Sequence, residues 1–328
     1  MQAILSVTIP FFALILLGYL AAQRHVLAES AIPGLNGFVL YFALPCMLFR
    51  FGMNTPVFDL LNPVVLSVYL TSALLMVFFT IAVTLSPRVH LKDASFGALV
   101  AAFPNTGFMG VPLLVALLGA AAAGPVICTV LADLFVTSSL CLALAHAHEA
   151  RKAGEDSASQ TSLGQTGLQA LRGALSNPLP WAIALGAVAS VTGLRLPGPI
   201  DALVKMLADA ATPVALFTIG AVLWRAGQHA HTRTPVALYL PVALIKLFVH
   251  PLLVFLLGAS ARALGMPISG FQLMVLTLAA ALPSASNVSL LAERYGADNG
   301  RVARIIMSST VLAFASFTLL AWAMGVRP

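Results

Sequence analysis

Charged side chains are scarce in this chain. Its 328 residues include 17 lysines and arginines and 11 aspartates and glutamates, or 9% of the chain, whereas a soluble domain carries roughly 25%. So few charges cannot supply the polar surface that a water-soluble protein of this length needs. Intrinsic disorder is excluded as well, because 60% of the residues are hydrophobic and disordered chains have low hydrophobicity. The composition therefore predicts an integral membrane protein.

Cysteine is rarer still. The chain has three cysteines, Cys46, Cys128 and Cys141, and all of them lie in apolar runs. A secreted disulfide scaffold is thereby excluded, and each cysteine is interpreted as a small hydrophobic residue.

Motifs for metal, nucleic acid and catalysis are also lacking. The pairs His146/His148 and His229/His231 do not have the spacing of a known metal site, so we expect no metal ion. No basic cluster indicates a nucleic-acid partner. Neither a Ser/His pair nor paired carboxylates lie at membrane depth, and no phosphate-binding loop is present. We therefore expect no enzyme and no cofactor.

Long apolar runs are what the chain has in abundance. A membrane-spanning helix needs ~20 mostly apolar residues, and the sequence offers ten such segments. They fall near residues 4–22, 33–52, 63–86, 95–118, 125–146, 178–195, 200–224, 235–259, 268–292 and 302–325. The sequence predicts an all-α polytopic membrane protein whose partner is the lipid bilayer.

One polar stretch, residues 148–174, divides the chain into 1–147 and 175–328, with five predicted spans on each side. Its Gly, Ser, Gln and charged residues are typical of a linker. Eleven basic residues fall on the linker's side of the predicted membrane and five on the other side, while Lys246 lies inside a span. The positive-inside rule then places the linker in the cytoplasm and both termini outside a bacterial-type inner membrane.

An internal repeat relates the two halves. Shifting residues 10–52 by 168 positions onto 178–220 gives twelve identities in 43 positions, where chance would give on the order of four. The matches include Pro10/Pro178, Gly18/Gly186, Pro45/Pro213, Phe49/Phe217 and Gly52/Gly220. Because each half has five spans, an odd number, the second repeat must be inverted in the membrane. Inverted repeats are typical of secondary transporters.

Two predicted spans carry proline and polar residues near their middle. One reads Ala-Phe-Pro-Asn-Thr-Gly over residues 102–107, and the other reads Ala-Leu-Pro-Ser-Ala-Ser-Asn over residues 281–287. Proline removes a backbone donor and breaks a helix, and freed backbone groups at that depth must line an enclosed cavity. We expect both helices to be broken and to cross at their breaks, where helix N-termini bind an anion. The candidate substrate-binding residues are Pro104, Asn105, Thr106, Pro283, Ser284 and Asn287.

Three ionisable residues within predicted spans are candidates for ion coupling: Asp133, Asp209 and Lys246. A charge at this depth indicates function or a paired partner. Either a carboxylate binds H⁺ or Na⁺, with Lys246 as its competitor or as an attraction for an anionic substrate, or Lys and Asp form a structural pair. A uniporter would need no coupling ion.

The motifs resemble those of a known family. Residues 104–112, Pro-Asn-Thr-Gly-Phe-Met-Gly-Val-Pro, resemble the fourth-helix motif of the auxin efflux carrier family, which includes bacterial malonate-type carriers and plant auxin exporters. Residues 44–49, residues 213–220, and Pro283 with residues 287–296 fit the same family. The resemblance implies ten helices in two inverted five-helix repeats, as in the bile-acid/sodium symporter superfamily, with helices 4 and 9 broken and crossed. It is also compatible with a homodimer.

Transport of small organic acids is what this resemblance implies. The residues and the resemblance together favour a secondary transporter of organic anions, such as malonate or auxin-like acids, that works by alternating access. A non-transporting membrane sensor and a membrane-embedded enzyme are the alternatives. The second break reads Pro-Ser-Ala-Ser-Asn, which departs from the plant form.

Overall fold

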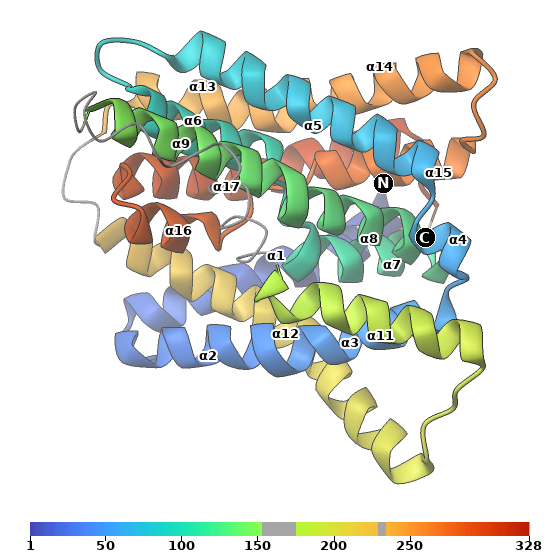
Figure 1. Ribbon diagram of the computed structural model, residues 1–328. Coiled ribbons are helices and arrows are strands. Elements are labelled where there is room, and N and C mark those ends of the chain that lie inside the picture. The colour runs from blue at the N-terminus through green and yellow to red at the C-terminus, as the bar shows by residue number, and fades with distance from the viewer. Residues whose placement is uncertain (153–174, 229–233, 328) are drawn as a thin grey trace.

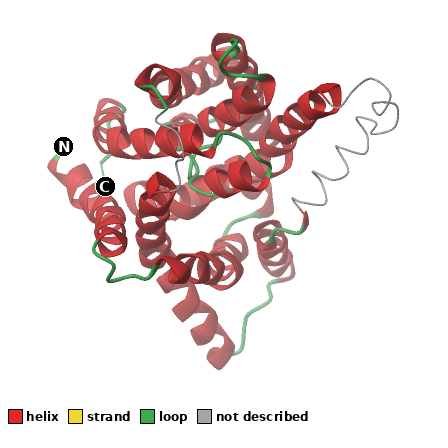
Figure 2. Cartoon of the chain, turned by 90° about the vertical axis from the view of Figure 1, so that its left-hand side faces the viewer, coloured by secondary structure: helices red, strands yellow, loops and turns green. Residues whose placement is uncertain are grey.

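The computed structural model describes residues 1–152, 175–228 and 234–327. Figure 1 shows these residues as a bundle of helices, and Figure 2 shows the same chain from its left-hand side as helices and loops. Within the described ranges the only β-structure is a pair of isolated bridges, Ser86–Val89 and Pro104–Ser284. The predicted all-α class is confirmed.

The first half of the chain contains α1 (Gln2–Gln23), α2 (Ile32–Phe38), α3 (Leu44–Asn54), α4 (Val57–Leu60), α5 (Pro63–Thr84), α6 (Leu91–Ala102), α7 (Val111–Leu118), α8 (Ala123–Ala132) and α9 (Ser138–Lys152). The second half contains α11 (Pro178–Thr192), α12 (Gly198–Gln228), α13 (Val236–Leu244), α14 (His250–Ala263), α15 (Gly270–Ala280), α16 (Val288–Arg294) and α17 (Asn299–Ala323). Four π-helical turns join neighbouring helices: η2 (Val39–Ala43), η3 (Thr106–Gly110), η5 (Asp133–Thr137) and η6 (Ile245–Val249).

Seven helices among the described residues are long and apolar enough to cross a membrane, spanning 2–23, 29–54, 63–84, 120–146, 198–228, 236–263 and 299–323. Shorter apolar helices cover 106–118, 178–192 and 270–280. The expected multi-pass membrane protein is therefore confirmed. Every predicted span overlaps helix, and the two predicted at 95–118 and 268–292 are interrupted. The arrangement as two inverted repeats stays a prediction. Most of the predicted linker, residues 153–174, lies outside the described residues.

The helices pack as two bundles, and each bundle takes helices from both halves of the chain. The panel bundle consists of α1, α2, α3, α11 and α12, with close packing of α1 on α12 and of α11 on α3. It forms the lower layer in Figure 1. The core bundle above it contains α5, α6, α8, α9 and α13–α17. Helix α7 and turn η3 lie between the two, against α1 and α12 respectively.

Glycines permit the close packing inside the panel bundle. A Cβ atom on Gly18 of α1 would overlap the backbone of Phe217 on α12, and one on Gly220 would overlap the backbone at Ile15. The α11–α3 contact repeats this pattern, because a Cβ on Gly186 would meet the backbone of Phe49. Small residues let apolar helices approach this closely where no hydrophobic force drives them together.

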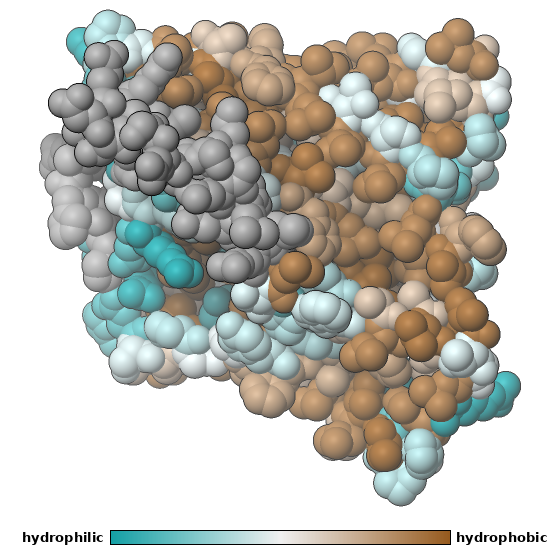
Figure 3. Space-filling view, viewed as in Figure 1, coloured by the Kyte–Doolittle hydropathy of each residue, from teal (hydrophilic) through white to brown (hydrophobic). Residues whose placement is uncertain are grey.

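Apolar side chains also cover much of the surface. Figure 3 shows them over the upper and right-hand parts of one face, with hydrophilic side chains gathered mainly toward the edges. Exposed large residues include Leu16, Phe79, Phe248 and Leu319. A surface of this kind suits contact with lipid rather than with water.

Candidate functional site at the crossing of two broken helices

The helix that begins with α6 is interrupted after Ala102. Phe103 has an extended backbone, with φ −102° and ψ 95°, and Asn105 is also non-helical. The chain resumes as turn η3 at Thr106 and continues into α7. Pro104 explains the interruption, since proline cannot donate a backbone hydrogen bond and disfavours helix in the residue before it.

The second interruption separates α15 from α16. Helix α15 ends at Ala280 and α16 begins at Val288, so the broken segment covers residues 281–287. Both predicted breaks are thus present, and each contains the proline that the sequence analysis identified.

The two broken segments contact each other through their backbones. Pro104 and Ser284 form an antiparallel bridge. The backbone N–H of Asn105 donates to Pro283 O at 2.8 Å, and that of Ala285 donates to Phe103 O at 3.0 Å. Backbone groups that each helix leaves unpaired at its break are therefore satisfied by the other helix. The crossing is a hydrogen-bonded unit.

Side chains tie the crossing to two further helices. The Ser284 hydroxyl donates to Val100 O on α6 at 2.7 Å, and the Ser284 N–H donates to Ser309 Oγ on α17 at 3.1 Å. Sequence reasoning missed Ser309, because a serine within a run of hydroxyl residues, Ser308-Ser309-Thr310, gives no signal of its partner.

The predicted binding residues all lie at this crossing. Pro104, Asn105, Thr106, Pro283 and Ser284 are buried, whereas Asn287 is half-buried at the start of α16. Thr106 Oγ1 is buried and has no hydrogen-bond partner among the described residues. Beside it, the position of a Cβ on Gly107 faces open space.

Two of the three ion-coupling candidates lie in a buried polar cluster next to the crossing. Asp133, in η5, accepts hydrogen bonds from Tyr69 Oη at 2.8 Å and from Thr137 Oγ1 at 3.0 Å. The Tyr69 ring lies 6.0 Å from that of His250. Sequence reasoning had not identified Tyr69 or His250.

Lys246 occupies the other side of the cluster, in η6. Its Nζ donates to Ala280 O, the last residue of α15, at 2.7 Å and lies 3.0 Å from His250 Nδ1. No ion pair joins Lys246 to Asp133 among the described residues. The ammonium group thus caps the carbonyl end of a broken helix, where a positive charge is favourable.

Asp209 lies elsewhere. It is on the exposed part of α12 and pairs with Lys205 one turn earlier, at 3.0 Å, with both side chains more than half exposed (60% and 65%). The structure brings Asp133 and Lys246 together and leaves Asp209 outside their cluster.

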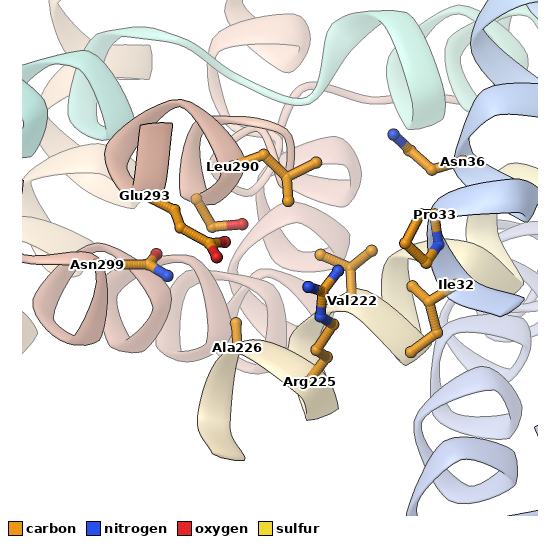
Figure 4. A pocket seen from close by; sticks show the side chains of 10 residues that line it. Ile32, Pro33, Asn36, Val222, Arg225, Ala226, Leu290, Glu293 and Asn299 are labelled. Carbon is orange, nitrogen blue, oxygen red and sulfur yellow. The ribbon is translucent and has the colours of Figure 1, made fainter. Parts of the chain in front are cut away.

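A pocket of about 110 Å³ opens between the two bundles (Figure 4). Its panel-bundle wall consists of Ile32, Pro33, Asn36, Val222, Arg225 and Ala226, and its core-bundle wall consists of Ser289, Leu290, Glu293 and Asn299. Helix α16 therefore reaches from the crossing, at its first residues, into the wall of this pocket.

Two interrupted apolar helices that cross inside an all-helical membrane protein define a class, the membrane transporters with discontinuous helices. Comparison with known proteins gives the family. A family model described as "Membrane transport protein" matches residues 3–322. The chain belongs to this family, the auxin efflux carrier family, and is a transporter rather than an enzyme.

Individual relatives match over nearly their whole length. A Rhizobium meliloti protein described as "Putative malonate transporter" is 30% identical over 97% of this chain and 95% of its own. The Escherichia coli K12 "Uncharacterized transporter YfdV" is 24% identical over 93% of this chain and 92% of its own. The Arabidopsis thaliana "Auxin efflux carrier component 8" is 23% identical over 89% of both chains.

Proposed function

We propose that this protein is a secondary transporter of small organic anions, mono- and dicarboxylates such as malonate or auxin-like acids, that works by alternating access. The observation that carries the proposal is the hydrogen-bonded crossing of the two broken helices, at Asn105 N–Pro283 O and Ala285 N–Phe103 O. In transporters built this way the substrate binds where the discontinuous helices meet. The names of two relatives, which mention malonate and auxin, agree with an organic acid.

The chemistry of the crossing suits a carboxylate. The helix formed by η3 and α7, residues 106–118, starts at the break, and the first N–H groups of a helix have no intrahelical acceptor. The Thr106 N–H donates to Pro104 O at 2.8 Å, so the N–H groups that follow it are the ones proposed to face the substrate. The open space over Gly107 leaves room for a ligand beside them. Thr106 Oγ1, which is buried without a partner, supplies a hydroxyl donor at the same place. The amides of Asn105 and Asn287 complete the proposed site.

The inverted repeat is supported by matched contacts. Gly18 contacts Phe217 across the α1–α12 interface, and their counterparts at a shift of 168 residues, Gly186 and Phe49, contact each other across α11–α3. A pseudo-twofold axis in the membrane plane relates such contacts pairwise. We therefore propose that residues 1–147 and 175–328 form the two five-helix repeats, each contributing to both bundles.

The orientation follows from charge. In Figure 1 both termini lie in the right-hand half, whereas α9 finishes on the left. Together with the excess of basic residues predicted on the linker's side, this supports termini outside and linker inside the cell membrane. A homodimer stays a prediction.

Ion coupling is proposed at the cluster of Asp133 and Lys246. Both are fully buried, and intramembrane ionisable groups mark ion or proton pathways. H⁺ and Na⁺ are the two candidate ions, and uniport without an ion is the third outcome that flux measurements distinguish.

Uptake of labelled malonate into proteoliposomes tests the function. We expect wild-type protein to accumulate or exchange malonate, and Asn105→Ala to lower flux at least tenfold, because the substrate loses an amide at the crossing. Asn54→Ala, which alters an exposed asparagine at the end of α3, should transport normally. Equal melting temperatures would show that the folds are intact. Absence of binding and flux across mono- and dicarboxylates would favour the sensor instead.

A further inference from the structure

The pocket between the bundles has a charged lining that the crossing itself lacks. Arg225 of α12 and Glu293 of α16 come from opposite bundles, and Figure 4 shows their side chains converging on the same space. Within the lining Arg225 is the one basic residue and Glu293 the one acidic residue. An anion that enters between the bundles meets a guanidinium group here.

Arg225 forms an ion pair with Glu29. Its Nε lies 3.4 Å from Glu29 Oε1, and both side chains are partly exposed, at 28% and 44%. A partly exposed ion pair is worth only ~0–1 kcal/mol. Exchanging this one ion pair for a pair with a substrate carboxylate therefore costs little. Arginine suits the exchange, because its planar group matches a carboxylate in two-point geometry.

The core-bundle wall of the pocket contains a buried polar atom without a hydrogen-bond partner among the described residues. This atom is Asn299 Oδ1. A buried polar atom without a partner costs free energy that a bound ligand or water recovers. Asn299 Oδ1 only accepts hydrogen bonds, so it can take one from water or from a protonated carboxyl group in the pocket but not from an ionised carboxylate. Asn36 lines the same pocket.

The pocket also lies close to the crossing along α16. Ser289 is in its wall, and Asn287 at the proposed substrate site is two residues earlier, or about 3 Å along a helix axis. Under the proposed orientation the pocket lies toward the cytoplasmic side.

We propose that this pocket is a docking site for the substrate's carboxylate on the cytoplasmic side, where Arg225 exchanges Glu29 for the arriving anion. The inference rests on the proposed function and adds a second binding station to it. Glu293 faces the same space and repels the anion, which keeps the station weak enough for the substrate to move on. Arg225 therefore strengthens binding, whereas Glu29 and Glu293 weaken it.

This assignment predicts opposite effects from the two partners of one ion pair. Malonate binding to purified full-length protein is measured by calorimetric titration in an Asn105→Ala background, which weakens binding at the crossing. Arg225→Gln should raise the Kd at least tenfold, and Arg225→Lys should raise it less. Glu29→Gln and Glu293→Gln should each lower the Kd several-fold. Arg50→Gln is the control. It breaks the Arg50–Asp201 ion pair, which lines a different pocket within the panel bundle, and it should leave the Kd unchanged.

A purely structural ion pair gives a different result. Arg225→Gln and Glu29→Gln would then shift the Kd in the same direction or leave it unchanged, and either result would overturn the inference. If Arg225→Gln does not fold, Glu29→Gln alone decides. A malonate Kd for Glu29→Gln that is equal to or higher than before the substitution would overturn the inference. If wild type transports malonate but Arg225→Gln leaves the Kd unaltered, the docking site is wrong and the proposed transport function stands. If the Kd changes as expected but wild type shows no malonate flux, the docking site stands and the proposed transport function is wrong.

Discussion

Lys246 is a buried cation whose partners are neutral. Its ammonium group donates to Ala280 O and contacts His250, so it satisfies a carbonyl that the end of α15 leaves without an intrahelical donor. A carbonyl end carries partial negative charge, which favours a cation at this place. Lys246 thus helps to stabilise the break between α15 and α16.

Replacing Lys246 by methionine tests this role. Methionine has a similar length and no charge, so Lys246→Met leaves Ala280 O buried without its donor, which costs about 1–3 kcal/mol. We expect a lower melting temperature in detergent, compared at one scan rate because membrane proteins often unfold irreversibly.

Lys205→Met is the matched control for this substitution. Lys205 also interacts with a residue one turn away, Asp209, but both side chains are exposed, and such pairs contribute little. Its melting temperature should stay near that of wild type. Equal shifts in the two variants would contradict a capping role for Lys246.

The sequence indicated the depth of Lys246 but not its partner. A Lys–Asp pair was one of its expected roles, yet no ion pair connects Lys246 with Asp133 in the described part of the chain. Each has other partners instead: Asp133 accepts from Tyr69 and Thr137, and Lys246 donates to Ala280 O. Tyr69 and Ala280 come from distant segments, so hydrophobic periodicity does not reveal these contacts.

At the scale of elements, the breaks were predictable and their hydrogen bonds were not. Pro104 and Pro283 locate the interruptions from sequence alone, because proline's effect on a helix is local. The pairing of Asn105 N with Pro283 O and of Ala285 N with Phe103 O depends on how two distant segments dock. The contribution of Ser309 depends on a third helix. Long-range register of this kind has no signature in a single chain.

The glycine contacts of the panel bundle yield a prediction about helix packing. Gly18→Ala and Gly186→Ala each place a methyl group against backbone, of Phe217 and Phe49 respectively. Overpacking costs typically ~1–3 kcal/mol, and backbone cannot move aside as a flexible side chain can. Both variants should melt at lower temperatures, by similar amounts if the two interfaces are equivalent.

Gly34→Ala provides the comparison for these variants. Gly34 is also helical, in α2, but a Cβ there meets nothing within 4 Å. Alanine stabilises a helix by up to ~1 kcal/mol relative to glycine, so this variant should melt at or above the wild-type temperature. If Gly18→Ala and Gly186→Ala melt at or above the wild-type temperature, as expected for Gly34→Ala, then α1 does not pack as closely on α12, nor α11 on α3, as described.

At the scale of the whole molecule, the panel bundle and the core bundle contact each other through a small number of helices and turns. Turn η3 and helix α7 contact α12 and α1, and α17 contacts both of those helices. The polar cluster belongs to the core bundle, and the crossing joins core helices α6, α15 and α16 to turn η3, which lies between the bundles. Movement of one bundle against the other would therefore carry the proposed substrate site and the proposed ion site together. This shared movement is what coupling by alternating access requires.

Flux under separate H⁺, Na⁺ and voltage gradients tests whether Asp133 couples an ion to that movement. A coupling carboxylate alternates between a charged and a neutral form, whereas asparagine is always neutral. Asp133→Asn should therefore still carry malonate down its own gradient but lose its response to the gradient of the coupling ion. Asp209→Asn, which changes an exposed carboxylate, should respond as wild type does. An unaltered response in Asp133→Asn would exclude Asp133 as the coupling group, and a wild type without any ion response would establish uniport.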